Sequence, residues 1–188
     1  MPAWSWSISA QDCTTGGKLR EIEGSTCSEC YALKGRYLFN NVTAAHARRR
    51  AALDHPQFVE AFVIVLTRLY ANMRRDEDRF RWMDSGDLPN LEALEKIVAI
   101  AEATPQIRHW LPTRELQIVR RLSSPIPANL TIRLSAPMIG QSITPLPGTT
   151  WSGVDVPDVA QCPAPSQGNQ CGDCRLCWGA EPVSYHLH

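Results

Sequence analysis

Apolar residues recur along the chain with spacings that fit first a strand and then helices. Residues 4–9 alternate large and small side chains, which predicts an opening strand. Residues 31–53 and 56–74 have helical spacing. The second of these segments is apolar on nearly every side, so we expect a largely buried helix there. Residues 10–30 contain three glycines and are expected to form a loop.

The middle of the chain alternates strand and helix patterns with short connections. Strands are predicted at residues 79–84, 106–111 and 129–135, with a further one at 149–152, and helices at 89–103 and 114–122. Thr113 is the expected N-cap of the last helix. Such an order implies right-handed parallel βαβ units. We therefore predict one α/β domain over residues 1–188, folded as a partial (β/α) barrel or an open parallel sheet.

The carboxyl ends of the predicted strands carry polar residues. In parallel α/β folds, binding and catalysis gather at this edge of the sheet. Ser85-Gly86-Asp87, Thr113-Arg114 and Ser135-Ala136-Pro137 lie there, together with the loop that follows the opening strand. Asp87 is a candidate site carboxylate, and it is equally a candidate N-cap of the next helix.

Composition limits the class of protein. The chain has 188 residues, and its formal net charge is zero, which does not announce a polyanionic partner. No apolar run reaches the roughly 20 residues that a membrane span needs. The first residues lack the basic and apolar regions of a signal peptide. We therefore expect a cytoplasmic protein with no membrane partner, in a compartment that keeps thiols reduced.

Seven cysteines form two groups near the two ends of the sequence, and residues 31–161 contain none. The loops around them are rich in Gly, Ser, Thr, Asp and Pro, where packing has little use for a thiol. Two-residue spacings, as in Cys27-Ser-Glu-Cys30, let sulfurs turn towards one metal centre. An odd number of thiols cannot all pair within one chain. We therefore predict metal ligation by Cys13, Cys27 and Cys30 and by Cys162, Cys171, Cys174 and Cys177.

The metal in the C-terminal tail, residues 156–188, has two alternatives. Four thiolates suit a closed [4Fe–4S] cluster or a structural zinc ion. The successive C-x-x-C steps from Cys171 to Cys177 favour the cluster. Cys162 lies apart from this trio, so an alternative is that it completes the N-terminal site in residues 1–34 and not the site of the tail.

Several motifs resemble known families. Trp4, Cys13 and Cys27-x2-Cys30-Tyr31-Ala32 resemble the opening of small phage-encoded proteins related to the radical S-adenosylmethionine superfamily. The strand ends at Gly86 and Thr113, with the tail Cys171-x2-Cys174-x2-Cys177-Trp178, resemble the phage family called gene product eighty-eight. The similarity is patchy but spans most of the chain.

This resemblance implies a fold, a cofactor and a compartment. It implies a partial (β/α) barrel in the host cytoplasm, with a [4Fe–4S] cluster on three cysteines whose fourth iron binds S-adenosylmethionine. Gly86 and Asp87 then occupy the strand end that binds the amine of this cofactor. The spacing departs from the superfamily signature, which has three and then two residues between its cysteines, because thirteen residues separate Cys13 from Cys27. Loop closure grows only with the logarithm of length, so the three thiolates can still meet.

Two functions from different classes follow. The first is a radical S-adenosylmethionine-type enzyme with an open three-cysteine site and an auxiliary four-cysteine site. The sequence does not indicate its substrate. The second is a non-enzymatic module, stapled by iron–sulfur or zinc, that binds a host protein or a nucleic acid. Seven cysteines divide naturally into three and four, which favours one open and one closed site.

Other polar residues have simpler interpretations. Arg48-Arg49-Arg50 can bind phosphate or nucleic acid, but such runs are more often a solvated helix face. His46, His55 and His109 are expected to be surface groups or hydrogen-bonded core groups.

Overall fold

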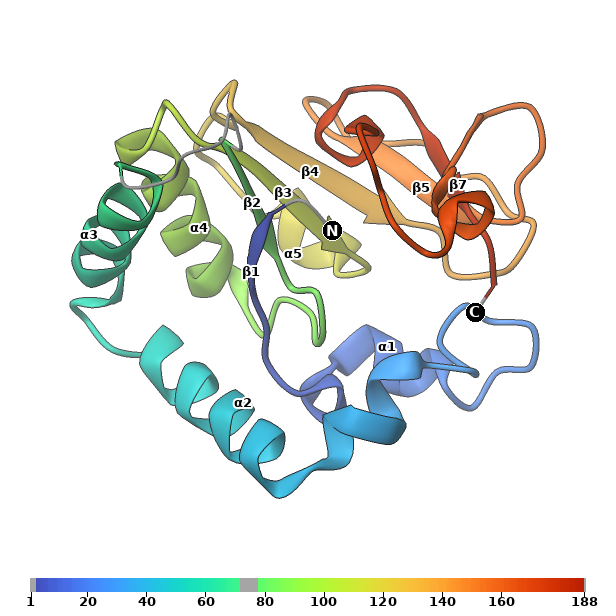
Figure 1. The fold of residues 1–188 in the computed structure, drawn as a ribbon, viewed down its shortest axis with the longest axis horizontal. Helices are drawn as coiled ribbons and strands as arrows, with labels where there is room; N and C mark the ends of the chain where they lie inside the picture. Colours follow the sequence, from blue (N-terminus) through green and yellow to red (C-terminus); the bar gives the residue numbers. More distant parts are fainter. Residues whose placement is uncertain (1–2, 72–77, 188) are drawn as a thin grey trace.

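One open, seven-stranded parallel sheet organises the protein (Figure 1). The computed structural model describes residues 3–71 and 78–187. Neighbouring strands follow the order β1-β2-β3-β4-β5-β7-β6, and every neighbouring pair is parallel. The strands are β1 Trp4–Trp6, β2 Arg79–Trp82, β3 Arg108–Thr113, β4 Leu130–Ser135, β5 Thr150–Val154, β6 Ala160–Gln161 and β7 Val183–Tyr185. The predicted α/β fold is confirmed, and the sheet is open and not closed into a barrel.

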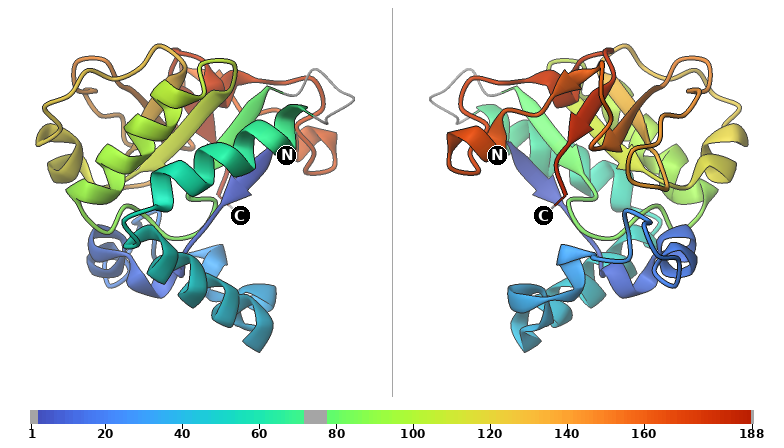
Figure 2. Two further views of the ribbon diagram at one scale, coloured as in Figure 1. Left: turned by 90° about the vertical axis from the view of Figure 1, so that its left-hand side faces the viewer. Right: turned by 90° about the vertical axis from the view of Figure 1, so that its right-hand side faces the viewer.

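The helices occupy two places relative to this sheet. They are α1 Thr14–Leu19, α2 Asn40–Leu53, α3 Phe58–Ala71, α4 Leu91–Ala103 and α5 Leu116–Arg120. Shorter 3-10 turns are η1 Ala10–Asp12, η2 Tyr31–Leu33, η3 Gly35–Leu38, η4 Ala164–Gln167 and η5 Leu176–Trp178. Helices α3, α4 and α5 pack on one face of the sheet, whereas α1 and α2 lie beyond its carboxyl edge (Figure 2).

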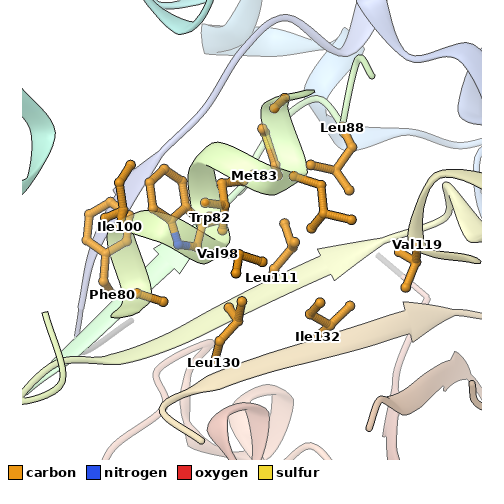
Figure 3. Close-up of a cluster of buried hydrophobic side chains, with 14 of the residues drawn as sticks. Phe80, Trp82, Met83, Leu88, Val98, Ile100, Leu111, Val119, Leu130 and Ile132 are labelled. Carbon is orange, nitrogen blue, oxygen red and sulfur yellow. The ribbon is translucent and has the colours of Figure 1, made fainter. Parts of the chain in front are cut away.

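The core lies between the sheet and its layer of helices. Helix α4 begins after Asn90, whose side-chain oxygen accepts the N–H of Ala93 at 2.8 Å and caps the helix. Its apolar side meets Trp82, Leu111 and Ile132 from three adjacent strands (Figure 3). Burying a side chain of this size contributes about 1.5–3 kcal/mol. Packing of the sheet against this layer of helices therefore fixes where the strand ends lie.

The opposite face of the sheet receives the C-terminal tail. Side chains alternate along each strand, so Trp110 faces away from the core that Leu111 helps to build. The ring of Trp178, in η5, meets Trp110 edge to face with 5.2 Å between centroids. The two cysteine-containing segments thus lie against the same sheet. The N-terminal loop lies at its carboxyl edge, and the tail covers the face that the helices leave open.

The predicted strands are confirmed, with shifted ends, but two strands are missed. Residues 106–111 were expected to form β3, which instead runs two residues later. Strand β2 ends at Trp82 because Met83 adopts a left-handed backbone, with φ of 50°. The short β6 and β7 lie in the tail, where patterns of two or three residues give no periodic signal.

The first long helix begins later than the sequence predicts. A single helix over residues 31–53 is wrong, because η2 and η3 occupy its first part and α2 starts at Asn40. Gly35, the first residue of η3, has a φ of 55° and interrupts the regular helical backbone there. The loop predicted at residues 10–30 also contains α1, which the adjacent glycines 16 and 17 had argued against.

The second long helix is less buried than predicted. Phe58, Phe62 and Leu66 of α3 enter the core, but Ile64 and Val65 are 46% and 56% exposed. The expectation of a helix buried on all sides is therefore wrong. Its predicted end at Arg74 lies outside the described residues. Among the residues that are described, no helix is both long enough and apolar enough to cross a membrane.

Candidate metal centre

A cavity of about 670 Å³ opens at the carboxyl edge of the sheet, and all seven cysteines line it. They come from the N-terminal loop and from the tail, and all have free thiols. The strand ends at Gly86, Asp87, Thr113 and Ser135 form another part of its wall. Sequence segments that are far apart along the chain thus place their sulfurs around one space.

The N-terminal sulfurs converge on Gly16, a buried residue of α1. The Sγ atoms of Cys27 and Cys13 lie 3.5 and 3.7 Å from the position that a Cβ atom would take on Gly16. The same position is 3.1 Å from the Cβ of Cys13, so a side chain there would crowd the cysteines. The missing side chain leaves a cradle whose lining is sulfur, as a bound cluster needs.

Burial controls the ionisation of these thiols. The pKa of Cys13 is raised to about 12, chiefly by burial and also by the nearby Asp87, Cys30 and Cys27. Burial also raises the pKa of Cys27, and the Arg114 guanidinium opposes this increase. The mutual influence of Cys13, Cys27 and Cys30 reflects how close together they lie. The raised pKa values of Cys13 and Cys27 favour their protonated thiols, and a metal that binds these two residues must displace their protons.

Two contacts anchor the N-terminal loop to the strand ends. The buried Glu115 carboxylate accepts the N–H and the hydroxyl of Thr15, both at 2.8 Å, in the first turn of α1. Thr26 donates its N–H to Pro137 at 2.9 Å, and its hydroxyl accepts from Arg114 Nη2 at 2.6 Å. These contacts fix the chain two residues after Cys13 and immediately before Cys27.

The tail cysteines form the second group. Burial raises the pKa of Cys162, with smaller contributions from the neighbouring thiols of Cys171 and Cys174. Burial also raises the pKa of Cys177, and its sulfur lies 3.2 Å from the Tyr185 hydroxyl. The nearby Cys162 adds to this increase, so all four tail cysteines interact with another member of their own group.

Arg133 is a fully buried cation beside this group. Its Nη1 donates to Trp151 O at 2.7 Å and to Glu181 O at 2.9 Å, and its Nη2 donates to Leu176 O and Gly179 O. Within the described part of the chain, every hydrogen-bond acceptor of Arg133 is a neutral carbonyl. Its positive charge opposes the raised pKa of Cys177. An anionic centre on the tail cysteines would balance that charge.

Gly86 and Asp87, the predicted cofactor-binding pair, line the cavity but also hold the edge together. A Cβ on Gly86, whose φ is 77°, would lie 2.4 Å from Ile8 Cγ1, so no larger residue fits. Asp87 is buried, and its oxygens accept from the Thr113 hydroxyl at 2.6 Å, Leu88 N at 2.7 Å and Arg114 N at 2.8 Å. Burial raises its pKa, and these bonds oppose that increase.

The N-cap interpretation of Asp87 is wrong, because Asn90 caps α4. Thr113 is likewise no N-cap, since it lies at the end of β3 and its hydroxyl accepts the N–H of Glu115 at 3.0 Å. Binding of a cofactor by Gly86 and Asp87 stays a prediction. The carboxylate of Asp87 already accepts hydrogen bonds from other residues of the protein.

Sequence reasoning missed four residues that shape this site: Glu115, Thr26, Arg133 and Tyr185. The signal that could have found Arg133 is its place in an alternating strand, where an arginine facing away from the core needs a partner. The contacts of Glu115 and Thr26 join residues about 100 positions apart, which no local pattern encodes. The simpler interpretation of the histidines is confirmed for His46 and His109, which are buried and hydrogen-bonded, and for His55, which is exposed.

The cysteines are not arranged as ligands of a single ion. In residues 3–71 and 78–187, no three His, Cys, Asp or Glu side chains are grouped closely enough to hold one metal ion. A cubane cluster differs from a single ion because each cysteine binds a different iron atom.

Comparisons with known proteins give one match. The model of a protein family described as gene product 88 matches residues 1–180. No curated protein and no solved structure matches the chain.

Proposed function

The chain belongs to the gene product 88 family, and we propose that it is an iron–sulfur protein with one three-cysteine and one four-cysteine centre. Cys13, Cys27 and Cys30 hold a [4Fe–4S] cluster with one open iron. Cys162, Cys171, Cys174 and Cys177 hold the second centre, for which zinc is the alternative. The match is consistent with a phage-encoded protein.

One observation carries this proposal: thiols from both ends of the sequence surround a single cavity. Bringing such distant loops together costs conformational entropy, which must be offset by what they bind or pack against. The loops are irregular and rich in glycine and proline, so a metal that crosslinks them supplies the missing stabilisation.

The surroundings of the cysteines support their division into one three-cysteine site and one four-cysteine site. Gly16 opens the cradle of the first group, and the cavity beside it leaves room for a ligand on an open iron. Arg133 supplies a buried positive charge to the second group, as an anionic, fully thiolate-ligated centre requires. The Tyr185 hydroxyl can donate to the Cys177 sulfur, and hydrogen bonds to cluster sulfurs adjust reduction potential.

We propose a radical S-adenosylmethionine-type enzyme as the activity. Cys13, Cys27 and Cys30 would hold the cluster, which, once reduced by an external electron donor, would supply one electron to bound S-adenosylmethionine. The chain's own residues orient this centre through Glu115 and Thr26 and shield it from solvent with Tyr31 and Tyr37, which line the cavity. Gly86 holds the ends of β1 and β2 close together beside it.

A non-enzymatic, metal-stapled module is the second candidate, and one observation favours it. Both oxygens of Asp87 already accept hydrogen bonds from the protein, so this carboxylate has little capacity left for a cofactor's amine. In such a module the metal would serve the fold, and the protein would act by binding a host protein or a nucleic acid.

Metal analysis of anaerobically purified protein tests the proposal. We expect broad visible absorption, with iron and acid-labile sulfide. Cys13→Ala should remove the cluster of the first site and keep the metal of the tail, whereas Cys171→Ala should do the reverse. Asp12→Ala and Gln170→Ala, at the exposed neighbouring positions, are matched controls that should keep both.

The outcomes separate the candidates. Colourless, iron-free protein would overturn the iron–sulfur proposal. Zinc bound only in the tail would support the metal-stapled module as the remaining candidate. Iron-loaded protein should bind S-adenosylmethionine in equilibrium dialysis and cleave it after reduction, and Cys13→Ala should do neither. Iron-loaded protein that fails to bind S-adenosylmethionine would contradict the enzyme and favour the module.

A further inference from the structure

Positive charge is concentrated in one segment of an otherwise acidic chain. Residues 31–53, which we call the basic arm, contain five of the 19 basic residues and none of the 19 acidic ones. The rest of the chain therefore has 14 basic and 19 acidic residues. A net charge of zero conceals this asymmetry, which produces a strong local field.

The basic arm consists of η2, η3 and α2, and it lies beyond the carboxyl edge of the sheet (Figure 2). Helix α2 buries only His46 and Leu53, so most of its surface faces solvent. Its three consecutive arginines differ, since Arg48 is exposed, Arg49 donates to the Ser7 hydroxyl at 3.1 Å and Arg50 pairs with Asp54. The run is therefore not one uniform solvated face.

Four cations of the basic arm can reach a ligand. Arg36 and Arg48 are exposed, and no side chain in the described part of the chain forms a hydrogen bond or an ion pair with either. Lys34 and Arg50 form exposed ion pairs with Glu29 and Asp54. Pairs of this kind contribute little to stability, so these cations can exchange a carboxylate for a phosphate.

Aromatic rings extend from the basic arm towards the cavity. Phe39 is 58% exposed, and its N–H donates to Arg36 O at 3.2 Å, so this ring and this cation share one turn. Tyr31 and Tyr37 meet edge to face, with 5.7 Å between centroids, and both line the cavity beside Cys30. Cations and rings thus form a surface that ends at the candidate metal centre.

We propose that the basic arm binds single-stranded nucleic acid, with its phosphates on Lys34, Arg36, Arg48 and Arg50 and its bases on the exposed rings. Exposed aromatics interleaved with cations bind unpaired bases by stacking while the cations follow the backbone. If the partner were an acidic protein, the cations alone would be enough to bind it. The exposed ring of Phe39 is therefore the feature that favours nucleic acid as the partner. This inference needs no metal chemistry, so its failure would leave the proposed centres untouched.

Fluorescence anisotropy of the full-length protein with labelled oligothymidine tests the proposal. With about four phosphate contacts on a single strand, affinity should fall about 50-fold between about 50 and 200 mM salt. Oligouridine and duplex DNA of the same length compare the kinds of nucleic acid. A polyglutamate peptide and phosphatidylglycerol vesicles, as competitors, represent the other polyanions.

Paired substitutions identify the surface. Arg36→Gln with Arg48→Gln should weaken binding and reduce the magnitude of the salt slope by about 1.4, since each phosphate contact on a single strand contributes about 0.7. Arg120→Gln with Arg121→Gln, an exposed pair on and next to α5, is the matched control and should change neither. Phe39→Ala should weaken binding about tenfold at unchanged slope, and Val65→Ala, an equally exposed apolar residue on α3, should not.

Three results would overturn the proposal. They are no binding at low salt, equal effects of the two arginine pairs, and displacement of oligothymidine by polyglutamate at equal charge. Equal loss in the Phe39→Ala and Val65→Ala variants would remove the stacking role. Circular dichroism of each variant would show whether it keeps the parent fold.

Discussion

At the scale of single residues, His109 shows how the core fixes a protonation state. Its ring is buried in β3 between two partners, Trp82 Nε1 at 3.2 Å from Nδ1 and Thr104 Oγ1 at 2.9 Å from Nε2. An indole N–H can only donate, so Nδ1 is the acceptor and Nε2 carries the proton. Burial lowers the pKa of His109 to about 4. The folded protein thus keeps this histidine neutral.

This neutral histidine predicts acid sensitivity. The unfolded chain gains a proton near pH 6.5, whereas the folded chain gains it only near pH 4. The contribution of His109 is therefore present above pH 6.5 and is lost as the pH falls towards 4, about 3 kcal/mol in all. Urea unfolding across this range should show a shallower pH dependence for His109→Gln than for the parent.

His55→Gln is the matched control, because His55 is exposed on the connection between α2 and α3. It should keep the pH dependence of the parent. An unchanged slope in His109→Gln would contradict the assignment of the neutral ring.

At the scale of elements, α1 depends on a contact from another part of the chain. This six-residue helix contains two adjacent glycines, so its own propensity is low. The Glu115 carboxylate, which precedes α5, accepts two hydrogen bonds from Thr15 and places a negative charge at the amino end of α1. The loop that carries Cys13 is therefore held by a residue of the β3–α5 connection.

Replacing Glu115 by Ala should loosen this element. The partly buried N–H and hydroxyl of Thr15 lose their partner, which costs about 2 kcal/mol. Amide hydrogen exchange should accelerate at Thr15 and Gly17, and unfolding in urea should occur at a lower concentration. Glu95→Ala, on the exposed side of α4, is the control with no expected effect. Parent-like exchange at Thr15 in the Glu115 variant would show that α1 forms without this contact.

At the scale of the whole molecule, Arg133 joins the sheet to the tail. Its guanidinium in β4 donates to one carbonyl of β5 and to three carbonyls of residues 176–181. Trp178, in the same part of the tail, packs on Trp110 and donates its indole N–H to Phe80 O. The tail is thereby attached to the open face of the sheet with its cysteines directed at the cavity.

Arg133→Met should detach the tail from the sheet. One buried and three partly buried carbonyls lose their donor, and we expect the free energy of unfolding to fall by about 4 kcal/mol. Metal analysis should show that the proposed metal of the tail is lost while the proposed cluster of the N-terminal site remains. Arg133→Lys should be intermediate, because an ammonium keeps the charge but lacks the planar fork. Arg120→Met, an exposed substitution, should resemble the parent, and full metal content in Arg133→Met would contradict this role.

The parallel α/β fold and the order of its main elements follow from the amino-acid sequence alone. Apolar side chains repeat with the period of each element, so Leu130 to Ser135 and Leu91 to Ala103 were readable without a structure. The cysteines were equally visible as candidates, because their spacing and loop context differ from those of core residues.

Where those cysteines lie, and what surrounds them, depends on how distant segments pack in the folded protein. Glu115 with Thr15 and Arg133 with the tail are contacts between distant segments, which local patterns do not encode. The exposed side of α3 and the late start of α2 depend on which neighbours are present to cover each helix. The physical reason is that spacing along a chain sets local conformation, whereas burial and pairing depend on which distant segments pack together.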